Sequence, residues 1–180
     1  MYKYSNERVY KLNHQEQKLV NLIGQEKYDE LCSKIPPPFN RDTQLNISDF
    51  LLQRNDQEIL DFYSELTNNN DWRSILKTAG IIIILASHIN DLLIRLVEKK
   101  EMDKDIIKKV SELKLHYRII FCTAKYNLPE EHFIQMMELK HFRNMVAHNF
   151  NLLMETEPNQ AIESMAKGKL IIMLLTGMLR

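Results

Sequence analysis

Glycine is scarce in this chain, with four residues in 180, and no glycine-rich loop that could hold nucleotide phosphates is present. The sequence also lacks a serine nucleophile in a G-x-S-x-G turn and any paired-cysteine or carboxylate motif typical of a metal site. These absences disfavour nucleotide hydrolysis and metallohydrolase chemistry. The sequence therefore predicts neither a cofactor nor a bound metal.

Cysteine and net charge are also low. Cys32 and Cys122 are too far apart in sequence for a metal knuckle or a redox pair, so we expect two reduced thiols. The 24 basic and 24 acidic side chains balance to a net charge of zero, which argues against a protein held on nucleic acid by a broad basic surface. Any contact with RNA is therefore expected to be local.

No apolar run reaches the roughly 20 residues that a membrane-spanning helix needs. The two longest runs cover residues 79–86 and 170–175, and the first ten residues are polar and charged. The sequence therefore predicts no membrane span and no secretory signal. A cytoplasmic location is the expectation.

Leu, Ile, Lys, Glu and Met are abundant and favour an all-α fold, an antiparallel helical bundle with short connections. The run 81–85 is apolar on every side, so we expect its helix to be buried at the centre of the bundle. The asparagine run 68–70 separates an N-terminal helical extension, 1–70, from the bundle, 71–180. Helices are predicted over residues 14–33, 49–66, 71–99, 106–126, 130–149 and 158–180.

One predicted helix carries a polar group that stands out from its surroundings. Arg143, Asn144 and His148 fall within an arc of about 140° on a helix that turns about 100° per residue. Asn144 and His148 are one turn apart. The opposite arc is apolar and carries Leu139, Phe142, Met145 and Val146. The polar trio is thus predicted to point away from the core.

Arg143, with four residues between it and His148 and with the polar Asn144 directly after it, resembles the motif of the HEPN superfamily. The resemblance covers about residues 71–180. It implies a HEPN-type helical bundle and a metal-independent endoribonuclease that cuts RNA through the 2′-hydroxyl. The segment 84–97, followed by the pairs Arg143-Asn144 and Ala147-His148, also resembles the mannitol operon repressor group, which implies regulation rather than cleavage.

The resemblance assigns a role to each motif residue. The His148 imidazole would carry the proton, because it titrates near neutral pH. The Arg143 guanidinium would hold the scissile phosphate and stabilise charge on its oxygens. Asn144 would fix the imidazole or contact the phosphate. Lys140 and His141, on the same helix, are the predicted RNA-binding residues.

Cleavage in line at phosphorus is best served by two proton-transfer groups, which the resemblance places across the interface of a homodimer. Phe133 and Met137 lie on the same arc as Asn144, so we expect them to supply apolar contacts to that interface. A toxin or defence role is predicted, with RNA as the substrate and an antitoxin or another regulatory protein as a partner.

Two other interpretations stay open. Arginine and histidine on an exposed helix face are most often solvated side chains. Alternatively, Arg143 and His148 are interface or helix-end groups, as the resemblance implies for superfamily members that keep the fold without cleaving RNA. In that case the chain is a non-catalytic helical interaction or regulatory module that binds a partner through its apolar C-terminal helix. His116 and Arg118 lack a spacing that aims them at each other, so they are predicted to be surface residues.

Overall fold

The computed structural model describes residues 12–36, 72–148 and 158–180, and every regular element in these ranges is an α-helix. The predicted all-α fold is therefore confirmed for the described part of the chain. The helix predicted over 49–66 and the boundary at residue 70 lie outside the described residues.

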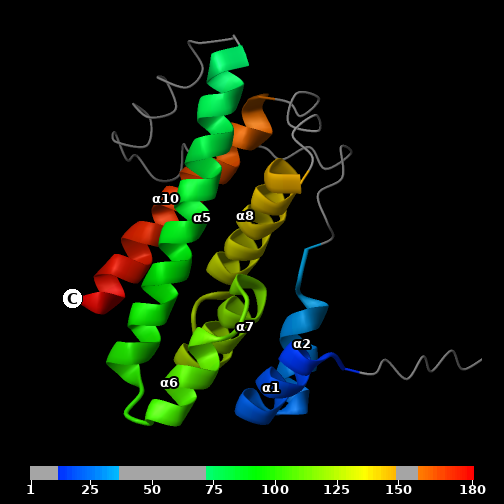
Figure 1. Cartoon of the computed structure of the whole chain (residues 1–180), viewed down its shortest axis with the longest axis vertical. Helices are drawn as coiled ribbons and strands as arrows, with labels where there is room; N and C mark the ends of the chain where they lie inside the picture. The colour runs from blue at the N-terminus through cyan, green and yellow to red at the C-terminus, as the bar shows by residue number, and fades with distance from the viewer. Residues whose placement is uncertain (1–11, 37–71, 149–157) are drawn as a thin grey trace, which may run out of the picture.

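The longest helix, α5 (Trp72–Lys100), is the centre of the bundle, as predicted. It packs against α10 (Pro158–Leu179) and α8 (Glu130–His148) and also contacts two shorter helices. In Figure 1, α8 runs antiparallel to α5, and α10 packs along α5. Leu93, Phe142 and Ile171 are fully buried, one from each of the three helices.

The three long helices approach closely at Gly168 of α10. A Cβ atom placed there would lie 3.2 Å from a methyl carbon of Leu139 on α8 and 3.2 Å from one of Leu85 on α5. These distances are tighter than ordinary van der Waals contacts, so glycine lets the helices pack at this depth.

An ion pair with little solvent exposure also fixes α10 against α8. The Lys167 ammonium lies 2.6 Å from a Glu163 oxygen in the same helix and 2.9 Å from a Glu138 oxygen of α8. Burial alone would lower the pKa of Lys167, but its hydrogen bonds and charge interactions with the two carboxylates raise the pKa above its usual value.

The single helix predicted over 14–33 is wrong, because Gly24 divides it into α1 (His14–Ile23) and α2 (Gln25–Ser33). The backbone at Gly24 has φ of 85°, a conformation that glycine adopts without the penalty of a Cβ atom. The side chain of Asn13 caps the start of α1. The break lets both helices pack against α7 (Leu115–Tyr126).

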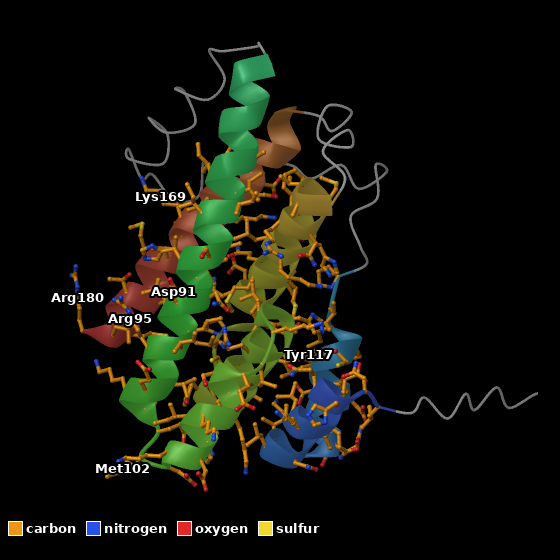
Figure 2. All side chains as sticks on the ribbon, in the orientation of Figure 1. Asp91, Arg95, Met102, Tyr117, Lys169 and Arg180 are labelled. Atoms are coloured by element: carbon orange, nitrogen blue, oxygen red, sulfur yellow. The ribbon has the colours of Figure 1, made fainter. Side chains whose placement is uncertain are left out.

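The first two helices share the main core, since Leu19, Tyr28 and Leu31 belong to the same buried cluster as the bundle residues. Polar contacts add to this packing. The Asn13 amide donates to the Tyr117 hydroxyl at 3.0 Å, at the place where α7 meets α1 (Figure 2). The described part of the N-terminal extension is therefore packed on the bundle.

The single helix predicted over 106–126 is also wrong, because it is interrupted between α6 (Lys104–Ser111) and α7. Arg118 explains the interruption. Its guanidinium donates to the carbonyl oxygens of Val110, Ser111 and Leu113 at 3.2, 2.8 and 2.6 Å, respectively. These carbonyls lie at and just after the end of α6, where few backbone donors of a helix remain.

Arg118 is only 3% exposed, so its predicted surface position is wrong. Its guanidinium also donates to the side-chain oxygen of Asn90 on α5. Burial lowers the pKa of Arg118, because taking a cation out of water costs free energy. One side chain thus ties α6, α7 and α5 together.

The apolar run 81–85 is not buried on every side as predicted. Ile82 is fully buried, whereas Ile83 is 40% exposed and Ile84 is 67% exposed. The apolar end of α10 is covered by the bundle, since Leu170, Ile171 and Leu175 are buried, although Met173 is 46% exposed. In both helices the buried side is the one that faces other helices.

One helical segment within the described residues, Ala79–Lys100, is long and apolar enough to cross a membrane by those two criteria alone. A core helix of a bundle meets the same criteria, and α5 packs against four other helices.

Candidate functional site

The motif residues lie in the last two turns of α8. Leu139, Phe142 and Val146 are buried, whereas Arg143 is exposed and Asn144 is half-buried. The predicted direction is confirmed for these two polar residues. His148 is the last residue of α8, and its side chain lies outside the described part of the structure.

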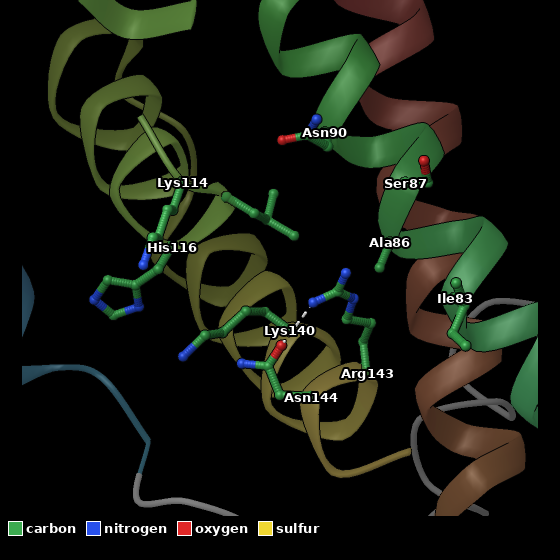
Figure 3. Close-up of a pocket in the computed structure, with 10 residues that line it drawn as sticks. Ile83, Ala86, Ser87, Asn90, Lys114, His116, Lys140, Arg143 and Asn144 are labelled. Atoms are coloured by element: carbon green, nitrogen blue, oxygen red, sulfur yellow. Dashed lines mark hydrogen bonds between the residues drawn. The ribbon is translucent and has the colours of Figure 1, made fainter. Parts of the chain in front are cut away.

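Asn144 contacts the arginine beside it. The Arg143 guanidinium donates from Nη1 to the Asn144 side-chain oxygen at 3.0 Å (Figure 3). Asn144 thus restricts the orientation of the guanidinium, a role that the sequence did not predict for it. Because the acceptor is neutral and exposed, this contact is worth about 1 kcal/mol or less.

Arg143 projects towards a cleft of about 440 Å³ between α5, α7 and α8 (Figure 3). This volume lies within the range of pockets that hold small ligands, about 300–1,000 Å³. The lining residues are Ile83, Ala86, Ser87 and Asn90 of α5, Lys114, Leu115 and His116 at the start of α7, and Lys140, Arg143 and Asn144 of α8.

The charged residues in this lining are all basic. Lys114, Lys140 and Arg143 come from two different elements, and no carboxylate is among the described residues that line the cleft. Although the whole chain has no net charge, this grouping of basic side chains creates a positive electrostatic potential at the cleft. The cleft is therefore suited to an anionic group.

Lys140 and His141, the predicted RNA-binding residues, differ in position. Lys140 is half-buried and lines the cleft, and burial lowers its pKa. His141 is half-buried but is not part of the lining. Its Nε2 atom is buried with no hydrogen-bond partner among the described residues, and burial and Lys140 lower its pKa.

His116, predicted to be a surface residue, is a half-buried part of the cleft wall. Burial, Lys140 and His141 lower its pKa to about 4, so its imidazole is neutral near pH 7. Its Nδ1 atom is buried with no hydrogen-bond partner in the described residues. A neutral imidazole offers one donor and one acceptor to a ligand.

Lys114 and His116 could not be assigned to this site from sequence spacing, because they belong to another helix. The feature that brings them to the cleft is the interruption before α7, which places Lys114 at the N-cap position. Its backbone N–H donates to the Gln15 side-chain oxygen of α1 at 3.1 Å. The first helix therefore helps to fix this wall.

Phe133 and Met137 do not form an apolar surface beside Asn144. Both are fully buried in the core, so the prediction that they supply dimer contacts is wrong. Their arc is covered because α8 packs against α5, α7 and α10.

Within the described residues, no group of three His, Cys, Asp or Glu side chains is placed to hold a metal ion. The chemistry that the cleft offers is hydrogen-bond donation and positive charge from α7 and α8, next to a wall containing Ile83 and Leu115. Such a site can bind and orient an oxyanion.

Comparison with known proteins adds no assignment, since no family model, curated protein or solved structure matches this chain.

Proposed function

We propose that this protein is a metal-independent endoribonuclease of the HEPN type that acts in the cytoplasm as a toxin or defence factor. The observation that carries the proposal is the exposed Arg143 guanidinium, oriented by Asn144 at a cleft that has basic residues and no carboxylate. Phosphodiester binding needs such an arrangement, because the substrate is anionic and a nearby carboxylate would repel it.

The reaction is an internal transfer at phosphorus. The 2′-oxygen attacks and forms a new P–O bond while the bond to the 5′-oxygen breaks. A base takes the proton of the 2′-hydroxyl, and an acid gives a proton to the leaving 5′-oxygen. The products are a 2′,3′-cyclic phosphate and a 5′-hydroxyl.

In this mechanism the Arg143 guanidinium binds the non-bridging oxygens and stabilises the charge that grows on them. His148, one turn after Asn144 on α8, is the proton carrier. A homodimer supplies a second copy of α8 and thus a second histidine for the opposite side of the phosphorus. Since Phe133 and Met137 are buried, other residues must form the dimer contact.

The test is incubation of RNA with purified protein in EDTA, read on a denaturing gel. We expect Arg143→Ala and His148→Ala each to reduce cleavage at least a hundredfold, the usual effect of losing a charge-stabilising or proton-transfer group. Asn144→Ala should cost about tenfold or less, because Asn144 acts through Arg143.

Arg95→Ala is the matched control, because Arg95 is an exposed arginine on α5 that does not line the cleft. It should cleave as the wild type does. Cleavage at the wild-type rate by both Arg143→Ala and His148→Ala would refute the proposal.

A non-catalytic interaction or regulatory module is the second candidate, and exposed apolar side chains favour it. Ile84 and Met173 are 67% and 46% exposed on α5 and α10. The buried positions of Leu170 and Leu175 remove most of the apolar surface that the sequence assigned to this role. Intact RNA with the wild type, together with normal growth of cells that express it, would favour this candidate.

A further inference from the structure

The cleft extends from the motif residues to a second set of groups on another helix. Arg143 and Asn144 belong to α8, whereas Lys114 and His116 belong to the start of α7 (Figure 3). Lys140, four residues before Asn144, also lines the cleft. A volume of about 440 Å³ is larger than one phosphate group needs.

We propose that Lys140 and Lys114 bind a second phosphate of the RNA strand, next to the phosphate held by Arg143. This inference rests on the proposed function, since it takes RNA as the ligand. It assigns a binding role to Lys114 of α7, a residue outside the sequence motif.

Charge and burial support this position for a phosphate. Lys140 is half-buried, and burial lowers its pKa, so a bound anion would relieve an unfavourable environment for its ammonium. His116 beside it is neutral near pH 7 and retains a buried nitrogen without a partner among the described residues. It can add a hydrogen bond without adding charge.

The helix dipole of α7 adds to the positive electrostatic potential of the cleft. Lys114 is its N-cap residue and makes no side-chain capping bond, and the first turn contains no acidic residue. The positive end of the helix therefore reaches the cleft without local neutralisation. Glu112, two residues earlier, is paired with Lys18 of α1 at 2.8 Å.

The wall that carries Lys114 is held in place before any ligand binds. Gln15 of α1 accepts from the Lys114 backbone N–H and donates to the Glu112 carbonyl oxygen at 3.5 Å. On the opposite side, Arg118 holds Asn90. A preformed wall reduces the ordering cost of binding.

The salt dependence of binding tests this inference. The probe is a fluorescent 2′-O-methyl oligonucleotide, which keeps every phosphate but has no free 2′-hydroxyl and so resists cleavage. The logarithm of the binding constant falls as the logarithm of the salt concentration rises. For a single strand, each lost phosphate contact makes this negative slope shallower by about 0.7. Because the two lysines share one phosphate, we expect the full loss from the Lys114→Gln/Lys140→Gln double variant and a smaller loss from each single variant.

The same slope sets the size of the effect. Between about 50 and 200 mM salt, the affinity advantage of the wild type over the double variant should shrink by about 2.6-fold. Lys114→Arg should keep the wild-type slope because it keeps the charge. Lys125→Gln is the matched control, an exposed lysine in the last turn of α7, and should also keep it.

The two proposals can fail separately. Lysine-dependent binding without cleavage by the wild type would support the second phosphate site and refute the ribonuclease. A wild-type slope for the double variant would overturn the second site, even if the wild type cleaves RNA. Equal slope losses in Lys125→Gln and the cleft variants would also overturn it, because the effect would then be one of net charge. Melting curves verify that each variant is folded.

Discussion

Replacing Arg118 with methionine should destabilise the protein substantially, although the substitution removes a buried charge. Arg118 is 3% exposed, and its guanidinium holds three carbonyl oxygens at and just after the end of α6 as well as the side chain of Asn90. Methionine fills a similar space but donates no hydrogen bond. The carbonyl oxygens of Ser111 and Leu113 would then lose this donor.

The magnitude follows from the burial of these contacts. The Val110 oxygen would keep the Leu113 N–H as a donor, but the oxygens of Ser111 and Leu113 would lose the guanidinium, and a buried acceptor that loses its partner costs about 1–3 kcal/mol. Two such acceptors give roughly 2–6 kcal/mol. Removing a cation whose pKa is lowered by burial returns part of this cost. We therefore expect a net loss of about 3 kcal/mol.

Thermal unfolding followed by far-UV circular dichroism measures this loss. For a chain of this length, about 3 kcal/mol corresponds to a decrease of roughly 6–12 °C in Tm. The Tm of Arg118→Lys should lie between those of the wild type and Arg118→Met, since an ammonium keeps the charge but not the planar set of donors. Arg95→Met, at an exposed position, should change stability by less than about 0.5 kcal/mol.

A Tm for Arg118→Met within about 2 °C of the wild-type value would refute the reasoning. It would mean that the carbonyl oxygens at the end of α6 find other donors. The interruption between α6 and α7 would then not depend on Arg118.

The remaining predictions concern Lys167 and His116. Lys167→Met should cost about 3–5 kcal/mol in urea titrations near pH 7, because the Glu163 carboxylate, 4% exposed, would stay buried without its cation. In the wild type the pKa of Lys167 is raised above its unfolded value of about 10.5. Lys167 therefore stabilises the folded protein below about pH 10.5, and this stabilisation is lost as the pH rises beyond the folded pKa. A free energy of unfolding that does not change with pH in the alkaline range would contradict this. NMR titration should give His116 a pKa of about 4, below its unfolded value of about 6.5, so its contribution to stability is present above about pH 6.5 and is lost as pH falls. Lys140→Gln should raise that pKa, and an unchanged value would show that Lys140 does not act on His116.

The fold was predictable where hydrophobic periodicity is long. The helices predicted over 71–99 and 130–149 agree with α5 and α8 to within one residue at each end in the described region. The interruptions at Gly24 and before α7 were missed. Both depend on tertiary contacts, since α1 and α2 pack on α7, and Arg118 satisfies the end of α6 from the next helix.

The candidate site was predictable only within one helix. Helical geometry places Arg143 and Asn144 on the polar side of α8, which the structure confirms. The same geometry failed for Phe133 and Met137, because a single helix does not reveal how many neighbours cover it. Lys114 and His116 reach the site through packing between helices, which a spacing pattern does not contain.

The docking of α1 on α7 has a consequence for synthesis of the chain. The bond between Asn13 and Tyr117 joins residues 104 positions apart, and Leu19 is fully buried in the shared core. At about 5–20 residues per second, the ribosome needs roughly 5–20 s to make the chain between these partners. During that interval the apolar side of α1 has no α7 to cover it. The first helix is made early and docks late, so the nascent chain presents it to chaperones until the α6–α7 segment has emerged.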